Sequence, residues 1–340
     1  MPDVVCVGES LFVLRPSAAG QSLADAPHFT RGVGGAESNV ACSLAASGHP
    51  VRWVSRLGTD GFGDHLLRTI AATGVDVSAV HRDPGRPTGL YFRTDGGTGD
   101  AEAAGRRAEA VHYRQGSAAA AMAPGSPPHS AWADTRILHL SGVTAALSDS
   151  CLRLLRELTA RTPGRPLVSF DVNHRPALWA RHESRADGGT VLLELARGSD
   201  LVFVGEDEAE AAFGITGGPA AIRAALPEPA AVVVKQDARG ATLLPASGSV
   251  HEPAPQVDVV APVGAGDAFA AGYLSALLRG LPPAARLRHG HLTAAAALTE
   301  PGDMAVPPSR ELADRLAALP PAEWAALRLR QGWTRQESPA

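Results

Sequence analysis

The run APVGAGD at residues 261–267 places small residues and one acid directly before an apolar stretch. Gly264, Ala265 and Gly266 leave backbone N–H groups accessible to an anion, and the start of a helix adds the positive end of its dipole. Asp267 falls in the first turn of that helix, where a carboxylate can accept the proton of an attacking hydroxyl. The run therefore has the features of a phosphate-transfer site, but taken alone it does not decide against a simpler alternative. The simpler alternative is that Asp267 only complements the helix dipole.

A second glycine-rich turn, GVGGAESNVA at residues 32–41, also leads into a helical pattern. At Gly34 and Gly35 the backbone can approach the hydroxyls of a sugar, and Asn39 adds a polar contact. The alternative is a helix entry that uses glycine only for its backbone freedom.

Several other motifs that carry chemistry are absent. The chain has no G-x-x-x-x-G-K-[ST] run, no G-x-G-x-x-G run between a strand and a helix, and no G-x-S-x-G run. These absences argue against a P-loop protein, a dinucleotide-binding fold and an α/β-hydrolase.

The composition limits the classes of partner and the cellular compartment that we expect for this chain. The 340 residues carry a net charge of −4, and Arg106-Arg107 is the longest basic run, so nucleic acid is not an expected partner. No apolar stretch is long enough for a membrane span, and no secretory signal is visible at the start. The three cysteines show neither metal nor disulfide spacing, which favours a cytoplasmic location. Lys235 is the only lysine of the chain.

Short apolar runs alternate with helical patterns along most of the chain. The runs predict a parallel sheet with helices on both faces, because they lack strict alternation of apolar and polar residues. The expected strands are Asp3–Val7, Val51–Ser55, Ile137–Leu140, Leu167–Phe170, Leu201–Val204 and Ala231–Lys235. The expected helices are Glu37–Ser47, Asp149–Arg161, Thr190–Arg197, Pro219–Leu226 and Ala265–Arg279.

Two segments, 11–30 and 88–114, interrupt this pattern with strands and turns that have no crossover helix. We expect them to form one small sheet inserted in a main α/β domain of residues 1–10, 31–87 and 115–320. The polar stretch 95–107 is expected to be a loop, and the tail 331–340 to be loose. Because the small sheet would expose an apolar face and an open edge, it predicts a homodimer or a higher homo-oligomer.

Three motifs together resemble one protein family. They are GGAESNVA at 34–41, RLGTDGFG at 56–63 and GAGDAF at 264–269, and they match the ribokinase-like carbohydrate kinases of the phosphofructokinase-B type in order and spacing across residues 3–310. The resemblance implies a β lid over the sugar, Asp267 as catalytic base, Gly264–Gly266 as anion hole, and ATP with Mg²⁺ as donor. It also implies that Lys235, Gly240 and His291 contact the nucleotide.

Within that family the 2-keto-3-deoxygluconate kinases fit best. The stretches VHYRQGSAA at 111–119, HLSG at 139–142 and FDVNHRPALW at 170–179 resemble theirs. The resemblance implies that Arg114 and Arg175 hold the acid end of the substrate, and that Tyr91 and His112 line the sugar pocket. Two guanidinium groups that converge from separate elements need an anion between them. The alternatives are a solvated Arg114 and an Arg175 paired with a carboxylate such as Asp171.

The chain departs from the family pattern at positions near the nucleotide. Ala261 stands where an Asp is usual, Gly205 replaces a common Asn, and His291 lies where Asn is common. Of the segment that places Mg²⁺, only Glu208 is carried over as a metal residue. The open alternatives are a 5-dehydro-2-deoxygluconate kinase or fructokinase of the same fold, and a catalytically weak sugar sensor.

Overall fold

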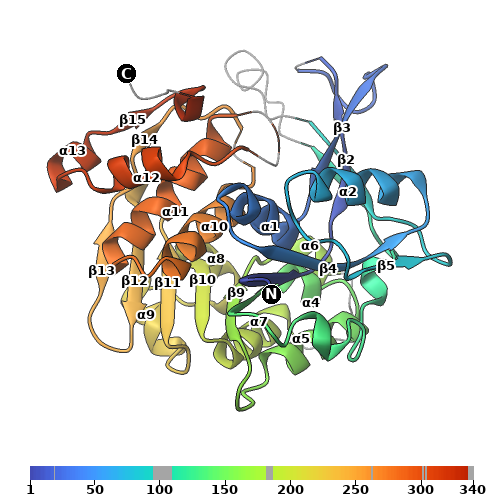
Figure 1. Cartoon of the computed structure of the whole chain (residues 1–340), viewed down its shortest axis with the longest axis horizontal. Coiled ribbons are helices and arrows are strands. Elements are labelled where there is room, and N and C mark those ends of the chain that lie inside the picture. Colours follow the sequence, from blue (N-terminus) through green and yellow to red (C-terminus); the bar gives the residue numbers. More distant parts are fainter. Residues whose placement is uncertain are drawn as a thin grey trace.

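Nine strands form the central sheet of the computed structural model, which describes residues 1–18, 20–94, 109–180, 187–261, 263–300, 302 and 305–335 (Figure 1). Their order across the sheet is β13-β12-β11-β10-β9-β8-β1-β4-β5. The strands from β5 to β11 are parallel, and β12 and β13 continue the sheet antiparallel at one edge. Their bounds are β1 Val4–Val7, β4 Val51–Gly58, β5 Val80–Asp83, β8 Ile137–Ser141, β9 Leu167–Asp171, β10 Leu201–Gly205, β11 Ala231–Lys235, β12 Ala241–Pro245 and β13 Val250–Glu252. The predicted α/β class with a mostly parallel sheet is confirmed.

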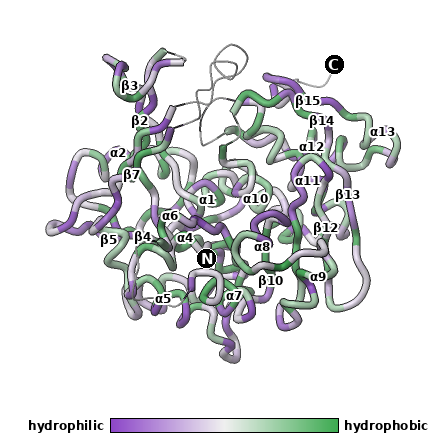
Figure 2. The backbone as a smooth tube through the Cα atoms, turned by 180° about the vertical axis from the view of Figure 1, so that it is seen from behind, coloured by the Kyte–Doolittle hydropathy of each residue, from purple (hydrophilic) through white to green (hydrophobic). Residues whose placement is uncertain are grey.

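Helices cover both faces of this sheet, and alternate side chains of each strand point to opposite faces. In β1, Val4 and Cys6 join a core with α1, α2, α10 and α11, whereas Val5 and Val7 join a second core with α5, α7, α8 and α9. Figures 1 and 2 view these two faces from opposite sides. The helices of the first face are α1 Ala36–Ala46, α2 Gly61–Ala71, α10 Ala265–Leu278 and α11 Pro283–Leu298. Those of the second are α4 Gly142–Ala145, α5 Asp149–Thr159, α6 Pro176–Trp179, α7 Gly188–Gly198, α8 Glu206–Phe213 and α9 Gly218–Ala225.

Side-chain caps fix where several helices begin. Asp60 accepts a hydrogen bond from the Gly63 amide at the start of α2, and Ser148 accepts one from the Cys151 amide at the start of α5. Such caps satisfy amides that have no partner inside the helix. At α10 the cap is Gly264, whose φ of 76° is left-handed and favours glycine.

The two inserted segments lie together in a separate four-stranded sheet, here called the lid, with the order β3-β2-β6-β7. Its strands are β2 Leu11–Pro16, β3 Phe29–Gly34, β6 Leu90–Arg93 and β7 Ala110–Tyr113. The strand β3 runs to Gly34, beyond the expected boundary at residue 30, and β7 ends just before Arg114. The predicted loop 95–107 lies outside the described residues.

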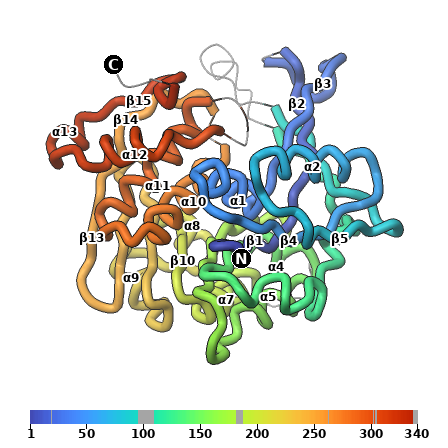
Figure 3. Tube along the Cα trace, viewed as in Figure 1, coloured from blue at the N-terminus to red at the C-terminus, as the bar shows by residue number. Residues whose placement is uncertain are grey.

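The C-terminal segments pack on the side of the molecule away from the lid (Figure 3). They comprise α12 Arg310–Ala317, α13 Pro321–Ala325, a short strand β15 Arg328–Leu329 paired with β14 Gln256–Val257, and a 3₁₀ turn at Trp333–Arg335. Trp333 is only 6% exposed and packs in a cluster with Leu329. The expectation of a loose tail from residue 331 is therefore wrong for this turn, because burial of the indole fixes it. None of the helices in the described ranges is long and apolar enough to cross a membrane.

Candidate active site

The carboxyl ends of the central parallel strands carry polar side chains that meet the start of α10. Asp171 ends β9 and Lys235 ends β11, with Lys235 in register with Gly205 at the end of β10. A crevice at this edge is where open α/β sheets bind ligands. At the start of α10, an added Cβ on Gly266 would lie 3.4 Å from the Lys235 ammonium nitrogen.

Asp267 lies in the first turn of α10 and is partly buried. Its Oδ2 accepts a hydrogen bond of 2.9 Å from the Asn39 side-chain amide of α1. Burial raises the pKa of Asp267 to about 6, and the nearby Asp171 carboxylate acts in the same direction. The Asn39 hydrogen bond and the charges of Arg175 and Lys235 oppose this rise. A carboxyl of this kind is deprotonated at neutral pH, yet more basic than an exposed aspartate.

Lys235 and Asp171 form an ion pair beside Asp267. The Lys235 nitrogen lies 3.1 and 3.0 Å from the two Asp171 oxygens. Burial acts to lower the pKa of Lys235, but the Asp171 and Glu208 carboxylates outweigh it, and the pKa is raised. The lysine is therefore a fixed cation at the start of α10.

Arg175 follows β9 and caps α6, with its side chain exposed. Its Nη1 donates to the His174 carbonyl at 3.1 Å, and its charge lowers the pKa of Asp267. The alternative of an ion pair with Asp171 is not what the structure holds, since Asp171 pairs with Lys235.

A cavity of about 580 Å³ opens from Lys235 and Gly266 toward the far end of α11. It brings together Lys235, Gly240, Glu208 and His291, and its remaining wall is largely apolar, with Val257, Val259, Phe269, Ala294, Ala295 and Leu298. Gly240 has a φ of 122°, and a Cβ there would lie 2.2 Å from the Glu252 carbonyl oxygen. Burial lowers the pKa of His291 to about 4, so its ring is neutral at pH 7, edge-on to Phe269.

Two rings of the lid are stacked on each other. Tyr91 on β6 and His112 on β7 are partners in register, with ring centroids 4.9 Å apart and planes 9° apart. Tyr91 is buried and His112 is exposed. Gly34 ends β3, and Gly35 caps α1 so closely that a Cβ would lie 2.4 Å from the Glu9 carbonyl oxygen.

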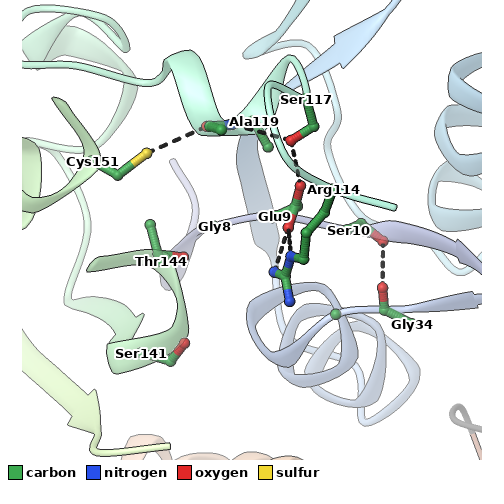
Figure 4. A network of polar contacts seen from close by, with 12 residues as sticks. Gly8, Glu9, Ser10, Gly34, Arg114, Ser117, Ala119, Ser141, Thr144 and Cys151 are labelled. Carbon is green, nitrogen blue, oxygen red and sulfur yellow. Dashed lines mark hydrogen bonds and ion pairs between the residues drawn. The ribbon is translucent and has the colours of Figure 1, made fainter. Parts of the chain in front are cut away.

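Arg114 is not the solvated side chain of the alternative. Its side chain is 9% exposed, and its Nε donates to Glu9 Oε2 at 2.7 Å (Figure 4). Its contact with a substrate stays a prediction. Glu9 already supplies the compensating charge. The reasoning that an anion must lie between Arg114 and Arg175 is therefore wrong for Arg114, because this chain carries that anion itself.

Comparison with known proteins agrees with this geometry, since residues 1–310 match the pfkB family carbohydrate kinases. The chain belongs to this family. It is 32% identical over 324 residues to 2-dehydro-3-deoxygluconokinase of Bacillus subtilis, covering 93% of this chain and 96% of that protein. The enzyme of the same name from Thermoproteus tenax is 31% identical, with 94% and 95% covered. Fructokinase-1 of rice is 33% identical over 212 residues, 62% of each chain.

Solved structures show the ribokinase-like fold of this carbohydrate kinase. A PfkB protein from Polaromonas sp. JS666 is 35% identical, with a TM-score of 0.77 over 87% of this chain and 96% of that one. A putative ribokinase II of E. coli, solved with ATP and Mg²⁺, has a TM-score of 0.80 at 23% identity, over 93% and 98% of the two chains. At that identity the likeness concerns the fold alone.

The lining of the kinase's cavity suits a nucleoside triphosphate. Its apolar wall and neutral His291 suit an uncharged base, while Lys235 and the start of α10 lie at the other end, where phosphates need cations and amides. At that end a Cβ on residue 266 would reach van der Waals contact with the Lys235 nitrogen, so the start of α10 lies directly beside the ammonium.

Magnesium is less well provided for by side chains. The two oxygens of Glu208 accept hydrogen bonds from the His174 amide at 2.6 Å and the Gly205 amide at 3.0 Å. Over the described ranges, no three His, Cys, Asp or Glu residues form a group that could hold a metal ion. Mg²⁺ commonly keeps several waters and binds to phosphate oxygens. In this kinase Glu208 would hold such waters rather than the ion itself.

Two carboxylates near the site were not predicted from the sequence. Glu9 anchors Arg114, and Glu37 is buried in α1, where its Oε1 accepts hydrogen bonds from the Ser141 amide and hydroxyl and from Thr144. Burial raises the pKa of Glu37 to about 7. Glu37 lies inside the GGAESNVA motif at the inward face of its helix, a signal that could have marked it as buried.

Proposed function

We propose that this kinase transfers the terminal phosphoryl group of ATP to the terminal hydroxyl of a small sugar acid, 2-keto-3-deoxygluconate above all. The observation that carries the proposal is Asp267, a basic carboxylate held by Asn39 beside the amides that start α10. A sugar sensor without catalysis would have no need for such a base.

Asp267 takes the proton of the sugar hydroxyl while the oxygen of that hydroxyl attacks the terminal phosphorus of ATP in line and ADP leaves. The amides of Gly264–Gly266 and the Lys235 ammonium stabilise the charge that spreads over the transferred group. Bound Mg²⁺ supplies further neutralisation of the phosphates. The lid, over the sugar, excludes water that would otherwise accept the phosphoryl group.

The acid end of the substrate pairs with Arg175 in this proposal. Within the described part of the chain this exposed guanidinium makes only a hydrogen bond to the adjacent His174 carbonyl, so its charge has no carboxylate partner there. A planar guanidinium suits a carboxylate, whereas a neutral sugar offers it no charge. The 2-dehydro-3-deoxygluconokinase relatives add support. Glu9 neutralises the charge of Arg114, so Arg114 contributes to this proposal by its place beside the sugar.

A coupled assay of ADP release tests the proposal with 2-keto-3-deoxygluconate, 5-dehydro-2-deoxygluconate, fructose and ribose as acceptors. A charge-assisted contact contributes about 1.5–3 kcal/mol, so kcat/KM for the preferred acid should exceed that for neutral sugars by roughly 10- to 150-fold. A preference for fructose would favour a fructokinase, in line with the rice relative. No turnover with any acceptor would favour the sensor.

A second copy of the chain is the partner we propose for the outer face of the lid. Phe29, Phe92 and Tyr113 make edge-to-face contacts there, and Tyr113 is 62% exposed. Phe29 and Phe92 are half-buried, and aromatic side chains gathered at a surface in this way favour association with a partner. A homodimer through the two lids would bury this face.

A further inference from the structure

Glu9 lies where the chain first passes from the main domain into the lid, between β1 and β2. Three further passages connect the two parts. They are Gly34-Gly35 between β3 and α1, residues 84–89 between β5 and β6, and residues 114–118 after β7. Glu9 contacts all three of them.

Its carboxylate joins the last passage. Oε2 accepts the Arg114 Nε at 2.7 Å and pairs with Arg114 Nη2, while Oε1 accepts the Ser117 hydroxyl at 2.7 Å. Figure 4 shows Glu9 between these two side chains. Glu9 and Ser117 are 2% and 1% exposed, so water does not replace these bonds. A buried ion pair depends on its partner, because removal of one charge leaves the other uncompensated.

Its backbone and carboxylate also fill the space at the other two passages. A Cβ on Gly35 would lie 2.4 Å from the Glu9 carbonyl oxygen, and one on Gly89 would lie 2.9 Å from Glu9 Oε1. The neighbouring Ser10 hydroxyl donates to the Gly34 carbonyl at 3.3 Å. Glycine at 35 and 89 therefore allows the chain to close around Glu9.

We propose that Glu9 is a positioning residue for the acceptor sugar: its carboxylate holds the lid at its hinge, and thereby the Gly34-Gly35 turn and Arg114 in their places beside the sugar. This inference rests on the proposed function for the substrate that it positions. It makes no use of direct contact between Glu9 and that substrate, since Glu9 is buried and both of its carboxylate oxygens are bound by Arg114 and Ser117.

The test is Glu9→Gln, which keeps the size and one acceptor oxygen but removes the charge. We expect the KM for 2-keto-3-deoxygluconate to rise at least tenfold, while kcat and the KM for MgATP stay within about threefold, because the nucleotide cavity contains no lid residue. Hydrogen exchange should quicken in the lid strands 11–16, 90–93 and 110–113 and stay unchanged in β8–β11. Wild-type values of both KM and lid exchange would overturn the proposal.

Two further variants test whether the effect comes from the Glu9–Arg114 ion pair and from its location at the lid. In Glu9→Gln/Arg114→Gln the uncompensated charge is gone, and lid exchange should return toward that of the wild type. Exchange as fast as in the single variant would overturn the role of the ion pair. The control is Asp200→Asn, which removes the charge that pairs with Arg161 and Arg165 at the amino end of β10, and it should leave acceptor KM and lid exchange unchanged. A control that quickens lid exchange equally would also overturn it.

If Glu9→Gln does not fold, Ser117→Ala decides the question. It removes one hydrogen bond and leaves the ion pair, so we expect the same changes at two- to fivefold, and wild-type behaviour would overturn the proposal. Lid exchange does not depend on which substrate is used. A wild-type enzyme inactive on every acid would therefore refute the proposed function and leave the role of Glu9 to the exchange data.

Discussion

The acidic limb of the pH–rate profile is the most direct measure of Asp267. A base must be deprotonated to accept a proton, and burial raises the pKa of this carboxyl to about 6. The kcat/KM for the sugar acid should therefore rise tenfold per pH unit below about pH 6 and level off above it, as it reports the free enzyme. An ordinary exposed aspartate would place that limb near pH 4.

Two neighbours should move the limb in opposite directions. The Asn39 hydrogen bond favours the charged carboxylate, so Asn39→Ala should shift the limb to higher pH. A hydrogen bond to a charged group is worth about 1.5–3 kcal/mol, and water can replace part of it at this partly exposed group, so we expect a shift of about one pH unit. Asp171→Asn removes a repelling charge and leaves Lys235 free to attract, which should shift the limb to lower pH.

Steady-state ADP release between pH 5 and 9 provides the assay, with Asp267→Asn as the reference. That variant should lose about 10²–10⁴-fold in kcat and show no limb. Because the folded-state pKa lies above the unfolded value of 3.8, the charged form costs stability above about pH 6. Asp267→Asn should thus melt above the wild type at pH 7.5, which separates lost chemistry from unfolding. An unmoved limb in both neighbour variants, or near-normal turnover of Asp267→Asn, would refute this role.

Other expectations follow from the same geometry. Arg175→Ala should raise the KM for the sugar acid at least tenfold and leave residual turnover of fructose nearly unchanged; equal losses would make the residue structural. Lys235→Arg should lower kcat/KM for MgATP at least tenfold, because a guanidinium cannot occupy the ammonium position beside Gly266, and unchanged kinetics would contradict this. Ala261→Asp should lower the KM for MgATP if a carboxylate there strengthens the metal network, and an unchanged or higher KM would count against that. Light scattering at micromolar concentration should find at least a dimer, and Tyr113→Asp should weaken it; a monomeric wild type would mean that the lid face stays exposed.

The fold and the helix start that carries Asp267 could be predicted from the sequence because their signals are local. An uninterrupted apolar run such as 201–204 is typical of a buried parallel strand, and Gly264 precedes the first residue of α10. The Glu9–Arg114 pair could not be predicted, since its partners are 105 positions apart and nothing in the stretch around Arg114 points to residue 9. The resemblance gives Arg114 a role at the substrate and says nothing of the carboxylate of this chain that binds it.

The single lysine of the chain lies in the candidate site, where its compact ammonium fits the space. All but one of the 31 basic residues are arginine, so the bias of the chain would favour arginine at 235 as well. Lys235 instead presents a compact ammonium that contacts both oxygens of Asp171 and lies close to Gly266. A planar guanidinium would need more room between β9, β11 and α10. Asp171 holds the Lys235 ammonium at the start of α10, where the proposal places the phosphates, and Asp267 and Arg175 carry two further opposed charges of the site. In the proposed reaction Asp267 takes the proton of the sugar hydroxyl and Arg175 pairs with the acid end, so we expect an acceptor with a hydroxyl and a carboxylate at opposite ends.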